Sequence, residues 1–65
     1  MKIIVQILGM NREALESHSG LKHGQEITES QLQGALMDLM LKMLYVNILP
    51  YQIGIYHFQI GFRQS

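Results

Sequence analysis

The strongest local signal in the sequence is the start of a long helix at Thr28, and this helix limits what the chain can fold into. Thr28 and Gln31 fit a capping box, in which a hydroxyl at the N-cap and an amide three residues later satisfy free backbone N–H groups. The pattern predicts a helix that runs to about Val46, where Asn47 can end it and Pro50 prevents its continuation.

This predicted helix is apolar around most of its circumference. One seam recurs at steps of four and three residues and consists of Leu32, Leu36, Leu39, Met43 and Val46. Further apolar residues widen the arc well past that seam: Met37, Met40, Leu41 and Leu44. Asp38 and Lys42 interrupt the apolar run, so we do not expect a transmembrane segment. A helix that is apolar most of the way round is buried most of the way round, which requires more cover than one small sheet supplies.

The chain has few means of supplying that cover itself. A domain of 65 residues buries only about 60% of the surface that its unfolded chain exposes. The sequence contains no cysteine, so neither a disulfide nor a thiolate zinc site can stabilise so small a domain. Charged residues make up 15% of the chain and hydrophobic residues 48%, which leaves little charge for the surface. We therefore expect the chain to associate with a second copy as a homodimer, with another protein, or with both.

The predicted interface combines the outer side of the long helix with an aromatic stripe near the C-terminus. It consists of Met37, Met40, Leu41, Leu44, Tyr56, Phe58 and Phe62. We expect a small intracellular, homo-oligomeric protein-interaction module that regulates or inhibits a larger protein. The lack of cysteine fits a reducing compartment, so we expect the protein in the cytoplasm.

Three other segments have recognisable patterns. Residues 3–8 are rich in β-branched side chains and predict a strand. Residues 12–19 predict a short helix, with Asn11 as its N-cap and Gly20 at the left-handed position after its end. Residues 51–62 predict one long strand region, in which glycines can mark bends.

Together these segments predict an α+β fold with a single small domain over residues 1–65. The predicted order is β-α-α-β, with a small sheet of two or three strands and one long and one short helix packed on one face. The crossover would make the first and last strands parallel. A third short strand near residues 22–27 would instead allow an antiparallel arrangement, and the sequence leaves both open.

His57 is a weak candidate for a catalytic residue, because imidazole can take up and release a proton near neutral pH. The alternative function is therefore a small oligomeric enzyme with an active site at a subunit interface. Its assisting residues would be Tyr45, Tyr56 or Arg63. No nucleotide-binding fingerprint is present, and we expect no cofactor.

The remaining candidates are a metal site and a nucleic-acid interface. A metal site needs several ligands that converge on one point, and nothing in the sequence holds His18 and His23 close to each other. We therefore expect no metal site. Tyr56, Phe58 and Phe62 form an aromatic stripe at strand spacing, which makes a nucleic-acid-binding sheet a second alternative. The five cations are scattered and the net charge is zero, so nucleic acid is not an expected partner.

Overall fold

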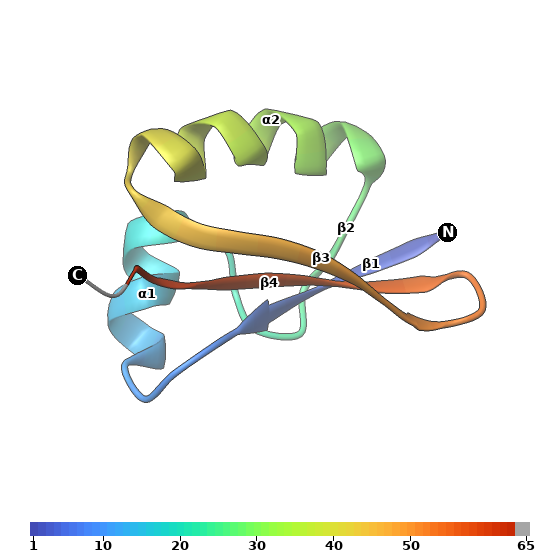
Figure 1. Cartoon of the computed structure of the whole chain (residues 1–65), viewed down its shortest axis with the longest axis horizontal. Helices are drawn as coiled ribbons and strands as arrows, with labels where there is room; N and C mark the ends of the chain where they lie inside the picture. The colour runs from blue at the N-terminus through green and yellow to red at the C-terminus, as the bar shows by residue number, and fades with distance from the viewer. Residues whose placement is uncertain (64–65) are drawn as a thin grey trace.

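Six elements follow one another in the order β-α-β-α-β-β in the computed structural model, which describes residues 1–63 (Figure 1). They are β1 (Lys2–Ile7), α1 (Arg12–Ser19), β2 (Glu26–Ile27), α2 (Glu29–Leu41), β3 (Leu44–Gln52) and β4 (Ile55–Phe62). The four strands form one mixed sheet, and the molecule is a small compact α+β structure.

The sheet has the strand order β2-β1-β4-β3. At its centre β1 and β4 are parallel, with Ile3 opposite Tyr56 and Ile7 opposite Ile60. β2 pairs with β1 and β3 pairs with β4, both antiparallel. The predicted order β-α-α-β with a sheet of two or three strands is therefore wrong. β2 lies between the two helices, and the last part of the predicted long helix belongs to β3.

The long helix ends at Leu41 rather than near Val46. The capping box at its start is confirmed: the Gln31 N–H donates to Thr28 Oγ1 over 3.1 Å, and the Thr28 N–H donates to Gln31 Oε1 over 2.8 Å. At the other end Met43 has a φ of 61°, a left-handed conformation that stops a helix. The chain then leaves in the direction of β3.

The composition of residues 44–52 explains why they form a strand. The segment reads Leu-Tyr-Val-Asn-Ile-Leu-Pro-Tyr-Gln, and its β-branched and aromatic side chains favour a pleated sheet. Because nearly every position is apolar, the segment also fits helical spacing, and periodicity alone does not separate the two. Pro50 is compatible with β3 because this strand lies at the edge of the sheet.

The predicted strand region 51–62 is divided by a hairpin turn. β3 ends at Gln52 and β4 begins at Ile55, so the two residues between them make the connection. Gly54 has a φ of 77°, which glycine adopts without the clash of a Cβ atom. This hairpin forms the narrow end of the molecule opposite α1 (Figure 1).

The short helix α1 has the predicted bounds. Gly20 follows it with a φ of 79°, and the Gly20 N–H donates to the carbonyl of Glu16 over 2.9 Å. Asn11 occupies the N-cap position, but its side chain makes no capping hydrogen bond. Within residues 1–63, neither α1 nor α2 is long and apolar enough to cross a membrane.

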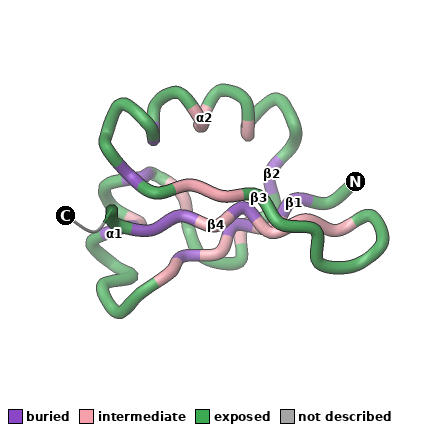
Figure 2. The backbone as a smooth tube through the Cα atoms, in the orientation of Figure 1, coloured by how far each residue is buried: buried purple, intermediate pink, exposed green. Residues whose placement is uncertain are grey.

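Both helices contribute to one core on one face of the sheet. The core consists of Ile3, Val5, Ile7, Leu15, Ile27, Leu39, Leu44, Phe58 and Ile60. Buried positions alternate along β1 and β4, since successive strand side chains point to opposite faces (Figure 2). The residues between them point to the other face, which neither helix covers and which we call the open face.

We expect Met43→Gly to stabilise the fold by about 1 kcal/mol, because glycine relieves the steric cost of the left-handed conformation. Met37→Gly is the matched control, since Met37 is equally exposed but lies within α2. There glycine should destabilise the protein by about 1 kcal/mol. Urea unfolding followed by circular dichroism measures both changes. Equal destabilisation by the two variants would show that Met43 is not left-handed.

Candidate interaction surface

One side of α2 is apolar and exposed, and we call it the α2 flank. Met37, Met40 and Leu41 have exposed fractions of 70%, 53% and 77%. Together with Gln33 and Leu36 they line a shallow depression of about 520 Å³. The flank carries no charged side chain, so water is the only thing that covers these three large apolar groups in the isolated chain.

The polar side of α2 faces α1, so the flank points the opposite way. Lys42, just after α2, contacts Asp38 at 3.0 Å and donates from Nζ to the carbonyl of His18 at the end of α1, over 2.9 Å. Leu39 points between these two sides into the core. At 100° per residue, Met40 lies on the other side of Leu39 from Lys42. The flank therefore points away from α1 and away from the core.

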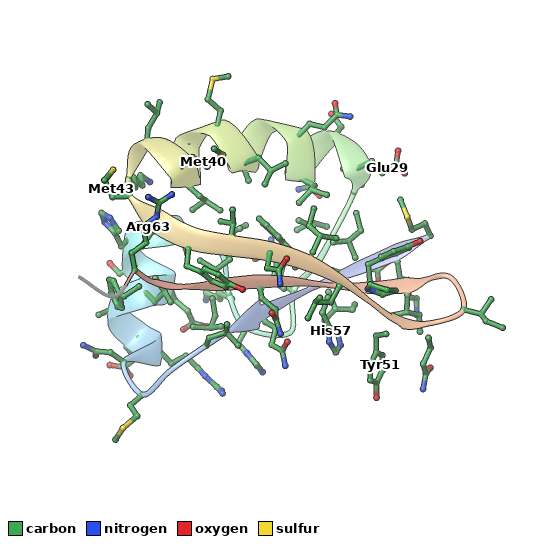
Figure 3. All side chains as sticks on the ribbon, in the orientation of Figure 1. Glu29, Met40, Met43, Tyr51, His57 and Arg63 are labelled. Carbon is green, nitrogen blue, oxygen red and sulfur yellow. The ribbon has the colours of Figure 1, made fainter. Side chains whose placement is uncertain are left out.

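A second, broader depression continues this apolar surface around the end of the sheet. It has a volume of about 1150 Å³ and is open to solvent. Met40 lines both depressions, and Tyr45, Val46 and Phe62 line the second. Arg63 is the one charged residue in its lining and lies with Met40 and Met43 at the same end of the molecule (Figure 3). The exposed apolar surface thus runs from α2 onto β3.

The structure divides the predicted interface residues into two groups. Met37, Met40, Leu41 and Phe62 are exposed and border the two depressions. Leu44 and Phe58 are buried in the core, and Tyr56 is half-buried. Tyr45 and Ile48 are exposed residues of β3 that the predicted interface lacks. The prediction placed Tyr45 near the end of a helix and assigned Ile48, which follows that helix, to no element. Their β-branched and aromatic character was the signal for a strand.

The outer edge of β1 is covered by the loop after α1. The Val5 N–H donates to the carbonyl of Gln25, and the Val5 carbonyl accepts from the Gly24 N–H, each over 2.8 Å. The Ile7 N–H donates to Nδ1 of His23 over 3.0 Å. Nδ1 must be unprotonated to accept this bond. His23 is thus a backbone cap, and among residues 1–63 no group of three or more His, Asp or Glu residues could hold a metal ion.

The outer edge of β3 is open. Just after β1, the Leu8 N–H donates to the carbonyl of Ile60 over 2.8 Å. The parallel register directs the other even-numbered residues of β4 toward β1 as well. The odd-numbered residues of β4 therefore turn toward β3, where they pair with Tyr45, Asn47 and Leu49. By alternation, the backbone groups of Val46 and Ile48 point away from the sheet. Leu44 has the same orientation, but the whole residue is buried.

A side chain partly covers this open edge. The Ile48 N–H donates to Oδ1 of Asn47 over 3.0 Å. Pro50 has the same outward orientation but carries no N–H. Val46 has neither cover, and no hydrogen bond of its outward N–H or C=O is found among residues 1–63.

His57 lies on the open face, where its ring stacks on Tyr51 with centroids 4.3 Å apart (Figure 3). Tyr45 lies on the same face but four residues further along the sheet, which is roughly 13 Å away. Tyr56 points to the opposite face, and Arg63 lies beyond the end of β4. The structure therefore does not bring the predicted assisting groups to His57.

The aromatic stripe of β4 faces the helices. Phe58 is fully buried beneath them, and Phe62 is half exposed at the end of the strand. Stacking of nucleic-acid bases requires exposed ring faces, and Phe58 offers none. Packing of the core accounts for most of this stripe.

We expect His23→Ala to destabilise the protein by about 1–2 kcal/mol, because the Ile7 N–H loses its acceptor next to the core. His18→Ala is the control, since the described contact of His18 uses its backbone carbonyl. That variant should change the free energy of unfolding by less than about 0.5 kcal/mol. Urea unfolding of both variants at pH 8 tests the difference, and equal effects would contradict the capping role.

Protein-family models, curated proteins and solved structures were each compared with this chain, and none of them matches it. No relative therefore supplies a function, a substrate or a partner. The surface formed by the α2 flank and the edge of β3 is what remains to indicate one.

Proposed function

We propose that this chain is a protein-interaction module that self-associates through the α2 flank. The observation that carries the proposal is the exposure of Met37, Met40 and Leu41 side by side on the α2 flank. Contiguous exposed apolar surface of this kind marks interaction sites in proteins. Methionine suits such surfaces because its flexible side chain adapts to a partner.

The free energy of dimer formation through the flank alone can be estimated from the apolar side chains that it would bury. Full burial of a large apolar side chain is worth roughly 1.5–3 kcal/mol. Since these three side chains are on average about two-thirds exposed, a twofold dimer that covers six of them would gain roughly 6–12 kcal/mol. Association costs about 4–15 kcal/mol in lost freedom. The flank therefore supports a weak dimer by itself, and a stable one needs neighbouring surface.

The wider parts of the expected function stay predictions. Regulation or inhibition of a larger protein would use the same exposed surface, either before or after self-association. The cytoplasmic location also stays a prediction.

We expect the chain to sediment as a dimer at micromolar concentration and Leu41→Glu to sediment as a monomer, because the carboxylate would be desolvated in the interface. Ile53→Glu is the matched control: Ile53 is fully exposed in the hairpin turn, away from the flank. This variant should leave the dimer intact. Sedimentation equilibrium gives the masses, and circular dichroism checks that both variants are folded.

A wild-type chain that stays monomeric up to high micromolar concentration would overturn the proposal. A dimer that Ile53→Glu disrupts, and Leu41→Glu does not, would place self-association elsewhere on the molecule.

A further inference from the structure

We propose that α2 pairs with α2 of a second copy, antiparallel about a twofold axis that passes between Gly34 and Met37. The inference rests on the proposed self-association through the α2 flank and specifies how the two copies meet. Its occupant is a second copy of this chain.

The side of α2 that points directly away from the core forms a narrow stripe, which we call the outer stripe. At 100° per residue, its residues lie within an arc of about 60°, opposite the buried Leu39. α2 forms the outer layer of the molecule in Figure 1, so the stripe faces away from the sheet. The outer stripe consists of Ser30, Gly34, Met37 and Leu41, and all four are exposed.

Small and large residues divide the outer stripe into two halves. Ser30 and Gly34 are small and come first, whereas Met37 and Leu41 are large and are 70% and 77% exposed. A twofold axis between Gly34 and Met37 places Gly34 opposite Met37 of the copy. The same axis places Ser30 opposite Leu41 of the copy. Each large side chain then lies over a small residue, as ridges lie in grooves between packed helices.

Other arrangements of the two helices fit less well. A register shifted by one helical turn would place Met37 against Met37 of the copy. A parallel twofold pair would align every residue with its own copy, so large residues would meet large ones. The antiparallel pair about the proposed axis matches each large residue with a small one, and the stripe is therefore complementary to itself in shape.

Gly34 has no role within one chain that would require a glycine. It lies within α2 and outside the left-handed region, and a Cβ atom added to it would meet no atom beyond its own stretch of helix within 4 Å. Glycine in the middle of a helix destabilises that helix relative to alanine. Contact with a second helix supplies a reason for it, since the distance between packed helices depends on the side chains at the contact.

The charges of α2 do not oppose this pairing. The outer stripe carries no charged side chain, and Asp38 pairs with Lys42 at 3.0 Å on the side that faces α1. Antiparallel pairing also brings the N-terminal end of each helix dipole beside the C-terminal end of the other, which is favourable. Two copies therefore meet without burying a charge.

The size of the contact indicates a reversible dimer. α2 has 13 residues and is thus about 20 Å long. Gln33 and Met40 border the outer stripe on its apolar side and extend the contact by one row. Even so, one helix offers fewer than the roughly 20–30 residues that each partner brings to a standard interface. We therefore expect the copies to associate reversibly at micromolar concentration.

Gly34→Ala tests the inference because it should act in opposite directions on the monomer and on the dimer. In the monomeric Leu41→Glu background, alanine should raise the melting temperature by about 4–8 °C, because it favours the helix and its methyl group has open space. In the otherwise wild-type chain it should raise the dimer dissociation constant at least tenfold, because the added methyl groups hold the helices apart. Circular dichroism and sedimentation equilibrium measure the two effects.

Ser17→Ala is the matched control. Ser17 is exposed within α1, so alanine there favours a helix that lies outside the proposed contact. This variant should leave the dissociation constant unchanged. A Gly34→Ala dimer as tight as the wild type, or tighter, would overturn helix pairing and leave association through another part of the flank standing. A wild-type chain that is monomeric would overturn both proposals.

Disulfide cross-linking tests the orientation, and the chain has no cysteine of its own to interfere. In the proposed pair Ser30 lies opposite Leu41 of the copy, whereas the two Ser30 residues lie about 16 Å apart along the helices. A mixture of Ser30→Cys and Leu41→Cys chains should therefore form the mixed disulfide under mild oxidation, and Ser30→Cys alone should not cross-link. Non-reducing electrophoresis and mass spectrometry identify the products. Cross-linking of Ser30→Cys to itself, or a dimeric mixture without the mixed disulfide, would overturn the antiparallel arrangement.

Discussion

The parallel pairing of β1 with β4 determines which parts of this molecule are covered and which are not. Once Ile3 lies opposite Tyr56 and Ile7 opposite Ile60, the apolar residues of both strands share one face, and both helices pack on it. The same register directs the even-numbered backbone groups of β4 inward and leaves the odd-numbered ones for β3. The open face and the open edge both follow from this central pair.

The two edges of the sheet differ in how far their outward backbone groups are hydrogen-bonded. At β1 the loop after α1 satisfies the outward backbone groups with two carbonyl or amide partners and one imidazole, so that edge is closed. At β3 one asparagine side chain covers one N–H, and α2 packs against this strand. Much of the uncovered apolar surface of this chain lies along α2 and β3, and the rest lies at Met1, at Met10 and in the hairpin turn at Ile53. This difference between the two edges favours association of another strand at β3 over association at β1.

Local signals in the sequence were reliable where a few neighbouring residues decide the structure. The capping box at Thr28 and the glycine after α1 specify helix ends through short-range bonds, and both are confirmed. The segment after Met43 was misread because its uniform apolarity satisfies two periodicities, and contact with β4 decides between them. Leu44 and Phe58 were placed at the interface for the same reason, since burial depends on a sheet order that no local pattern contains. The exposed Met37, Met40 and Leu41 were accessible to sequence reasoning because they lie within the part of the helix that was read correctly.

The short connection between α2 and β3 has a consequence for how this chain can vary. Met43 turns the chain in a single left-handed step, and the side chains of β3 alternate between faces from Leu44 onward. One inserted or deleted residue here would shift that alternation by one position, so Leu44 and Val46 would turn to solvent and Tyr45 to the core. The length of this connection is therefore as constrained as the identity of any buried side chain, and natural variants should tolerate substitutions there far better than changes in length.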